Sequence, residues 1–433
     1  MQVRQTAVLR LLVASALAAT GLVLISAAAP SLAAAGNDKH GAGTEYVSTH
    51  GSPSNAGKNC GTASFSRIGD AVAAAPDGGT IVVCPGTYAE DVLIQKPLTL
   101  IGQNATIDAT GLENAIQVVA SGVTVRGFRL VNANGEGLLV GIDSFADFGL
   151  LPSGSPVLSG ETVQDVKALN DDRGFNGTEN GNCKYPGDCG GGIHLNVVES
   201  SVIEGSQATG NADGILLTDD YGPNAHNLLQ GNFVSDNRTE CGIVLPSHSS
   251  DAVSYVASPN GSFTVTGRNP DQGGVYDNVV RGNVAIDNGT ATAPPEFGGV
   301  GGSGSGIGVF GSGPGSGAYD NLLEGNYLAG NGLAGITFHA HHPGGEDING
   351  NDIVGNVFAT NNVTGDTFDG GVSNFATTGV AIYSVPPVEQ RIANNVIRDN
   401  AIGIWLTDTV TADGLGSNAY RHVGTPVVVE PAN

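Results

Sequence analysis

The sequence is poor in positive charge, in bulky side chains and, beyond its first residues, in long apolar runs. Its 17 Lys and Arg are outnumbered by 41 Asp and Glu, which gives a formal net charge of −24 at pH 7. Because such a surface repels phosphate backbones, we expect no nucleic-acid partner. Trp and Met occur once each, which argues against a fold built from bulky helices. After residue 35 no apolar run is long enough to cross a bilayer, so we expect no membrane span in the mature chain.

The first 35 residues are predicted to be a secretory signal peptide. Arg4 and Arg10 supply its positive charge, an apolar run covers residues 11–29, and small residues at 33–35 suit cleavage. We therefore expect a secreted, extracellular protein, and its alanine- and glycine-rich composition is typical of a bacterium. Residues 36–60 are predicted to be a flexible segment.

Cysteine is also scarce, with five in the chain. Because export places a chain in an oxidising environment, the close spacings predict two disulfides, Cys60–Cys84 and Cys183–Cys189. Cys241 is left without a predicted disulfide partner. It directly precedes an apolar strand and is expected to be a buried free thiol. No Cys/His spacing resembles a structural zinc site.

Glycine, in contrast, is abundant, with 67 residues or roughly twice its average usage. Asparagine-rich corners alternate with short apolar strands, as in Asn227-Leu-Leu-Gln-Gly-Asn and Asn321-Leu-Leu-Glu-Gly-Asn. A second recurring phrase is a strand that begins at a glycine, namely Gly192, Gly214, Gly242, Gly306, Gly335, Gly379 and Gly403. The intervals fit a coil of roughly 22–24 residues, with loop insertions predicted near 249–305 and 343–378. Asn tolerates left-handed geometry and can hydrogen-bond along a stack, so the repeat predicts a β-solenoid.

An opening segment precedes the repeat. Residues 64–75 place apolar side chains at helical spacing, and the strands Thr80-Ile-Val-Val-Cys-Pro-Gly-Thr-Tyr and Leu98-Thr-Leu-Ile-Gly follow. Together with the Asn-x-Ile/Val and Gly-Ile phrases, this opening resembles the right-handed parallel β-helix repeats of the pectin-lyase-like superfamily, including NosD-like proteins. The resemblance implies an all-β, right-handed parallel β-helix over residues 61–412, with a short N-terminal capping α-helix and a C-terminal tail at 413–433. For function it implies a carbohydrate-active protein, in a superfamily of lyases, hydrolases, esterases, epimerases and non-catalytic members.

The glycine-led strands, aligned on their glycines, separate inward from outward positions. Residues one and three places after the glycine are apolar throughout, so the fourth and sixth places are predicted to face outward. Because adjacent coils lie about 4.8 Å apart, polar residues at these places should gather on one face. We predict catalytic roles for Asp219, Asp220, His248 and His341, and substrate-binding roles for Phe310, His339, His342 and Tyr383.

Three chemistries and a non-catalytic alternative remain open for this face. Asp219 or Asp220 with a histidine could hydrolyse a polysaccharide, although hydrolases usually employ two carboxylates. A histidine could instead abstract the proton beside a uronate carboxylate, as a lyase or epimerase does, with Ca²⁺ held by acidic loops. A transition metal could bind a set such as His339, His341 and His342. In the alternative, the β-helix binds polysaccharide without catalysis. The sequence requires no cofactor and does not fix the oligomeric state.

Overall fold

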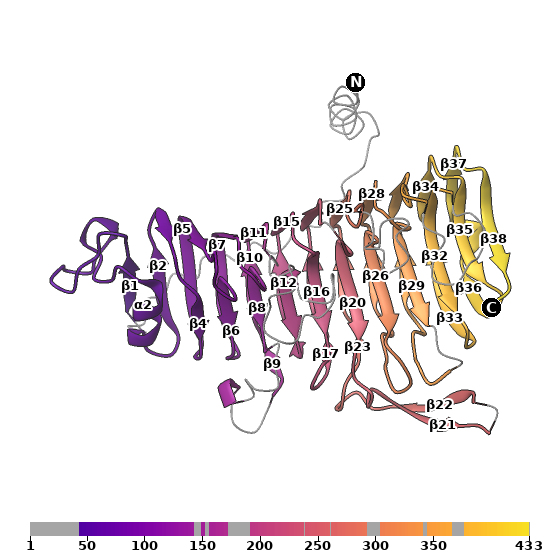
Figure 1. The fold of residues 1–433 in the computed structure, drawn as a ribbon, viewed down its shortest axis with the longest axis horizontal. Coiled ribbons are helices and arrows are strands. Elements are labelled where there is room, and N and C mark those ends of the chain that lie inside the picture. Colours follow the sequence, from indigo (N-terminus) through magenta and orange to yellow (C-terminus); the bar gives the residue numbers. More distant parts are fainter. Residues whose placement is uncertain are drawn as a thin grey trace. The chain divides into compact units, whose positions relative to one another are not determined.

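Short strands joined by glycine and asparagine corners wind into successive coils, and each coil adds strands to the same stacked sheets (Figure 1). The computed structural model describes residues 43–142, 149–151, 156–171, 191–237, 239–259, 261–291, 304–340, 344–365 and 376–432. Within these ranges, the antiparallel hairpin of β21 (Val253–Ala257) and β22 (Phe263–Arg268) is the one exception to parallel pairing. The fold is the right-handed parallel β-helix that the sequence predicts.

The parallel strands form three sheets. Sheet A takes two strands from most coils: β1 (Thr44–Val47), β2 (Gly79–Val83), β3 (Gly86–Tyr88), β5 (Leu98–Asp108), β7 (Thr124–Val131), β10 (Thr162–Gln164), β11 (Lys167–Leu169), β14 (Val202–Glu204), β15 (Gln207–Thr209), β18 (Leu228–Gln230), β19 (Phe233–Ser235), β24 (Val279–Arg281), β25 (Val284–Ile286), β27 (Leu322–Glu324), β28 (Tyr327–Ala329), β30 (Asp352–Val354), β31 (Val357–Ala359), β33 (Val388–Ala393), β34 (Val396–Arg398), β36 (Val410–Asp413) and β37 (Ala419–Arg421). Sheet B takes one: β4 (Val92–Ile94), β6 (Ile116–Val118), β8 (Leu138–Val140), β12 (Gly191–Asn196), β16 (Asp213–Thr218), β20 (Ile243–Ser247), β26 (Ile307–Gly311), β29 (Ile336–Ala340), β32 (Thr378–Ser384), β35 (Ile402–Thr407) and β38 (Thr425–Glu430). Sheet C is short: β9 (Leu158–Ser159), β13 (Val198–Glu199), β17 (Asn224–Ala225) and β23 (Val275–Tyr276).

The inside of the coils is filled by side chains from alternate strand positions. Ile215 pairs in register with Ile243, Ile243 with Ile307, and Ile307 with Ile336. All four are fully buried in the hydrophobic core. Since successive side chains of a strand point to opposite faces, the residues between them point away from this core. The predicted stacking of inward apolar residues is confirmed.

Buried asparagines hold the corners of successive coils together. In one ladder the backbone N–H of Asn232 donates to Oδ1 of Asn283 (2.9 Å), and that of Asn283 donates to Oδ1 of Asn326 (2.9 Å). The Asn283 side chain also donates to the carbonyl of Leu229 at 2.9 Å. Each asparagine thus satisfies backbone groups that a sharp corner would otherwise leave buried and unpaired. The ladder continues through Asn356, Asn395 and Asn418.

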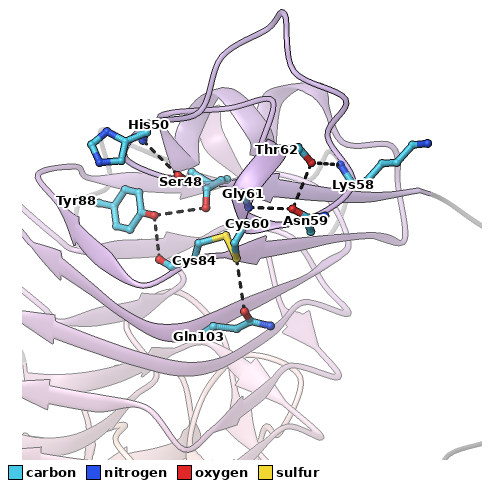
Figure 2. Close-up of a disulfide and its surroundings, with 11 residues drawn as sticks. Ser48, His50, Lys58, Asn59, Cys60, Gly61, Thr62, Cys84, Tyr88 and Gln103 are labelled. Carbon is cyan, nitrogen blue, oxygen red and sulfur yellow. Dashed lines mark hydrogen bonds between the residues drawn. A yellow bond between two sulfur atoms is a disulfide. The ribbon is translucent and has the colours of Figure 1, made fainter.

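The N-terminal coil contains the predicted helix, shortened to α2 (Ile68–Ala74). It packs near β1, β2 and β4, and its capping function stays a prediction. Strand β1 lies within the segment predicted to be flexible and pairs with β2. The predicted Cys60–Cys84 disulfide is present and ties the short 3₁₀ helix Cys60–Thr62 to the strand end at Cys84 (Figure 2). Beside it, the Tyr88 hydroxyl donates to the Cys84 carbonyl at 2.9 Å.

The other cysteine predictions have different outcomes. Cys241 is a free, buried thiol, as predicted, and burial raises its pKa well above the ordinary value. Cys183 and Cys189 lie outside the described residues, so their pairing stays a prediction.

Coil strands extend past several predicted boundaries. Strands β37 and β38 lie in the segment predicted to be a C-terminal tail, and they pair with β34 and β35. Strands β23 to β25 lie inside the range predicted as the first insertion, and β30 and β31 lie inside the second. The inserted parts are therefore shorter than predicted. Among the residues that the structure describes, no helix is long and apolar enough to cross a membrane.

Candidate functional site

The C-terminal ends of the sheet B strands place the predicted site residues in neighbouring coils. Pro246 pairs with Phe310, Phe310 with His339, and His339 with Tyr383. Strand β20 pairs directly with β26, so the long interval between Gly242 and Gly306 contains no additional coil. The alignment on glycine therefore gives the correct register.

Asp220 and His248, two of the predicted catalytic residues, are joined through their side chains. They follow β16 and β20 in adjacent coils, and Nδ1 of His248 lies 2.7 Å from Oδ1 of Asp220. The His248 side chain is 36% exposed and the Asp220 side chain 31% exposed, so the pair is held by the protein yet reached by solvent. When Nδ1 donates to the carboxylate, the neutral ring carries its lone pair on Nε2. Such a histidine has the electronic form of a general base.

Further donors hold the Asp220 carboxylate in place. Oδ2 accepts hydrogen bonds from the Asn196 amide at 2.7 Å and from the Thr218 hydroxyl at 3.3 Å. Burial pushes the pKa of Asp220 upward. The hydrogen bond from His248, the positive charges that His248 and His194 carry when protonated, and the Asn196 amide outweigh that effect, so the pKa is below its ordinary value. Asp220 is thus kept ionised and oriented toward His248.

Asp219 has a different setting, although it is adjacent in sequence. Its buried carboxylate accepts from the Ser247 hydroxyl (2.7 Å) and from the backbone amides of His248 (2.5 Å), Ser249 (3.2 Å) and Gly274 (2.6 Å). Burial raises its pKa, and the hydrogen bonds from Ser247 and the His248 amide offset this only in part. These contacts make Asp219 an anchor for the backbone that carries His248, not a second solvent-facing carboxylate.

The predicted substrate-binding residues that the structure describes are half-buried or buried. Phe310 and His339 are half-buried, with ring centroids 5.5 Å apart in a T-shaped contact. Phe310 also packs against the buried cluster of Leu216, Cys241 and Val244, so its ring is partly structural. Tyr383 is only 6% exposed and packs in a cluster with Trp405, which leaves it little surface for a ligand. His341 and His342 lie outside the described residues.

The chain is similar to several solved structures, all at low sequence identity. No family model and no curated protein matches the sequence. Among solved structures, the A-module of mannuronan C-5 epimerase AlgE4 from Azotobacter vinelandii is 15% identical, with 82% of this chain and 90% of that chain covered, at a TM-score of 0.45. The A-module of the Azotobacter vinelandii epimerase AlgE6 is 15% identical (84% and 94% covered, TM-score 0.42), and pectate lyase Pel9A is 12% identical (90% and 78% covered, TM-score 0.31).

The fold is a parallel β-helix. The stacked parallel sheets carry this assignment, and they confirm the architecture that the sequence resemblance implied. Because this fold hosts many activities, the chemistry has to be argued from the site itself.

Sequence reasoning assigned no role to His194, which the structure places beside the Asp220–His248 pair. His194 is buried, its Nε2 lies 2.8 Å from the Thr218 hydroxyl, and its Nδ1 lies 3.1 Å from Oε1 of buried Glu136. A signal was available, since His194 follows Gly192 by two places and so faces outward in the glycine alignment. Glu136 precedes β8 and carried no such signal.

Two other features of the surface bear on the site. Within the described ranges, no three His, Cys, Asp or Glu side chains gather closely enough to hold a metal ion. An open hollow of about 430 Å³ lies at the sheet A corners, away from the Asp220–His248 pair, and is lined by Gln164, Asp165, Glu204, Gly205, Gln230, Gly231, Arg281 and Gly282. The candidate site is therefore an outer face of sheet B, where a long ligand could cross several coils.

Proposed function

We propose that this protein is a secreted carbohydrate-active enzyme in which His248, oriented by Asp220, transfers a proton to and from a polysaccharide. The observation that carries the proposal is the 2.7 Å contact between Nδ1 of His248 and Oδ1 of Asp220 on a solvent-reached face. A carboxylate that orients a histidine is a recurrent arrangement for a general base. The predicted signal peptide supports secretion.

The setting of Asp219 favours proton abstraction over two-carboxylate hydrolysis. Glycoside hydrolases of the usual kind need an acid and a second carboxylate on opposite sides of the scissile bond. Here the carboxylate of Asp219 accepts four hydrogen bonds from the protein. That of Asp220 accepts from Asn196, Thr218 and His248. The histidine is then the group suited to exchange a proton with substrate, as in a lyase or an epimerase.

The proposed reaction begins at the sugar carbon that bears a carboxylate. Nε2 of His248 removes the proton from that carbon, and the electron pair of the broken C–H bond moves into the carboxylate group. In a lyase this pair then forms a double bond and expels the neighbouring glycosidic oxygen, which takes up a proton. In an epimerase a proton returns to the same carbon from the opposite side. Both routes require a uronate in the polysaccharide and a cation that neutralises its carboxylate.

The net charge of the chain makes that cation important. A protein with a formal charge of −24 repels a polyuronate at low ionic strength. Ca²⁺ binds carboxylate oxygens and could bridge the two. Half-buried Phe310, one coil beyond His248, offers an apolar ring edge to a sugar face.

The proposal is tested by incubating the mature protein with acidic and neutral polysaccharides, with Ca²⁺ or with a chelator. Lyase products are read by ultraviolet absorbance, hydrolysis by reducing ends, and epimerisation by proton NMR of the sugar C–H. His248→Gln should lower turnover on a uronate polymer by about 100-fold or more, the usual contribution of a positioned base. The matched control is His422→Gln, because His422 forms a similar pair with Asp399 at 3.0 Å in a C-terminal coil.

Two results would contradict this assignment. Equal activity in the wild type and in His248→Gln would show that the active site lies elsewhere on the protein. Release of reducing ends from a neutral polysaccharide, with no product from uronates, would favour hydrolysis. If the panel yields no product but the polysaccharide still binds and Phe310→Ala weakens that binding, the non-catalytic alternative is the correct one.

A further inference from the structure

A continuous line of polar side chains runs from buried Glu136 to the exposed His248. Glu136 contacts His194 on β12, His194 contacts Thr218 on β16, Thr218 contacts Asp220, and Asp220 contacts His248. The four distances are 3.1, 2.8, 3.3 and 2.7 Å. Since β12 pairs with β16 and β16 with β20, each step crosses at most one coil boundary.

The donors and acceptors of this line can be ordered in one consistent way. An ionised Asp220 can only accept hydrogen bonds, so the Thr218 hydroxyl is the donor in its hydrogen bond to Oδ2 of Asp220. The Thr218 oxygen then accepts from Nε2–H of His194, which lies 2.8 Å away. Nδ1 of His194 and Oε1 of Glu136, 3.1 Å apart, must then share one proton between them. The Glu136–His194 pair thus directs an N–H toward Thr218 and, through it, toward Asp220.

Coil stability alone does not require a histidine at this position. The equivalent places, two residues after the leading glycine, contain Leu216, Val244, Gly308, Thr337, Ala381 and Trp405 in the later coils. Leu216 and Val244 are buried there in an apolar cluster. An apolar residue at 194 would therefore suit the fold, and burying a histidine and a glutamate together costs desolvation free energy.

We infer that Glu136, His194 and Thr218 are positioning residues, which hold Asp220 ionised and aimed at His248. The inference rests on the proposed function, because an oriented Asp220 matters only if His248 acts as a base. What the inference states physically is that Asp220 is ionised and points at His248. The Asp220 side chain accepts hydrogen bonds from His248, Asn196 and Thr218. His248 and His194 also favour its ionised form through the charge they carry when protonated. Without the Thr218 hydroxyl, Oδ2 keeps only the Asn196 amide among these donors.

The test is the titration of the Asp220 carboxyl carbon, followed by carbon-13 NMR in the full chain. In the wild type its midpoint should lie below the ordinary aspartate value. Thr218→Val keeps the shape of the side chain and removes the hydroxyl, so the pKa of Asp220 should shift upward. Thr218→Ser restores the hydroxyl and should return the titration toward that of the wild type. If the valine variant does not fold, His194→Leu replaces it, because Leu216 occupies the equivalent place in the next coil, and it should cause the same upward shift.

The matched control is Thr407→Val. Thr407 holds the same place in a later coil as Thr218, is equally buried, and donates to the Ser384 carbonyl. It lies far from Asp220 in the stack, so its replacement should leave the Asp220 titration unchanged. An unshifted titration in Thr218→Val, or an equal shift in Thr407→Val, would overturn the inference.

The titration needs no substrate, so it separates this inference from the proposed function. A shift that is specific to Thr218→Val, in a protein without activity on any polysaccharide, would support the positioning chain and count against the enzyme. Activity that depends on His248, with an unshifted titration in Thr218→Val, would support the enzyme and overturn the positioning chain.

Discussion

The carboxylate of Asp219 accepts a hydrogen bond from the backbone amide of Gly274, 55 residues further along the chain, at 2.6 Å. The same carboxylate binds the amides of His248 and Ser249. It therefore joins the two ends of the inserted segment that contains the β21–β22 hairpin. His248 stands at the first of these ends, so the side chain that closes the insertion also fixes the backbone of the proposed base.

Replacement of Asp219 by Asn should destabilise the protein measurably. An amide can offer one oxygen to the His248 and Ser249 amides, but its NH₂ group would then face the N–H of Gly274, a donor against a donor. The free energy of unfolding should fall by about 2 kcal/mol, the cost of leaving a buried donor unsatisfied. Urea denaturation of the two proteins measures it. Asp251→Asn is the control, since Asp251 is exposed in the same insertion and should change stability by no more than about 0.5 kcal/mol.

The hairpin itself is held against the coils by Arg268. Its Nε donates to Oδ2 of Asp347 at 2.7 Å, and its Nη1 forms an ion pair with Asp320. The guanidinium carbon lies 3.9 Å from the centroid of the Tyr319 ring. Arg268→Ala removes the ion pairs and the cation–π contact together. Limited proteolysis should then cut within residues 253–268 several-fold faster than in the wild type. Arg126→Ala, at an exposed arginine on β7, should leave the cleavage rate unchanged, and equal cleavage in Arg268→Ala and the wild type would show that other contacts hold the hairpin.

Much of the fold could be predicted because the strand period and the corner chemistry are local properties. The alternation after Gly214 and Gly242 fixed which side chains face inward, and the register of Ile215 with Ile243 follows from it. Asparagine corners were recognisable because Asn both tolerates tight corners and presents an amide to the next coil. Strand β1 was missed because it is short and separated from its partner β2 by a long stretch that contains helix α2 and no other strand.

The site was harder to predict, because its contacts depend on distant residues. The sequence grouped Asp219 with Asp220 on one face, but the partners of Asp219 include Gly274, which only the closed insertion brings near. Tyr383 sits at an outward position, and yet neighbours such as Trp405 cover it. The pairing of His248 with Asp220 was predictable, since both occupy the same place in adjacent coils.

The asparagine ladder gives a prediction that depends on position along the stack. Asn283→Ala removes the acceptor of the Asn232 amide and the donor to the Leu229 carbonyl, so two buried backbone groups lose their partners. We expect a loss of about 3 kcal/mol in the free energy of unfolding. Asn418→Ala, at the last described rung of the same ladder, removes the acceptor for the Asn395 amide and the donor to the Ile392 carbonyl. It should cost less, because Asn418 is 9% exposed against 1% for Asn283 and water can take its place more easily. Chemical denaturation compares the two, and an equal or smaller effect for Asn283→Ala would contradict the ladder's role.

The lowered pKa of Asp220 predicts a pH dependence of stability with a definite sign. An aspartate whose folded-state pKa lies below its unfolded value of about 3.9 stabilises the folded protein above that value, because the unfolded chain binds the proton more readily. This contribution should be lost as the pH falls through the folded-state pKa. The difference in unfolding free energy between the wild type and Asp220→Asn should therefore be largest near about pH 6 and shrink toward about pH 3. Urea denaturation across this range measures the difference, and Asp251→Asn, at an exposed carboxylate, provides the baseline. A difference that stays constant or grows on acidification would mean that His248, Asn196 and Thr218 do not favour the ionised form of Asp220.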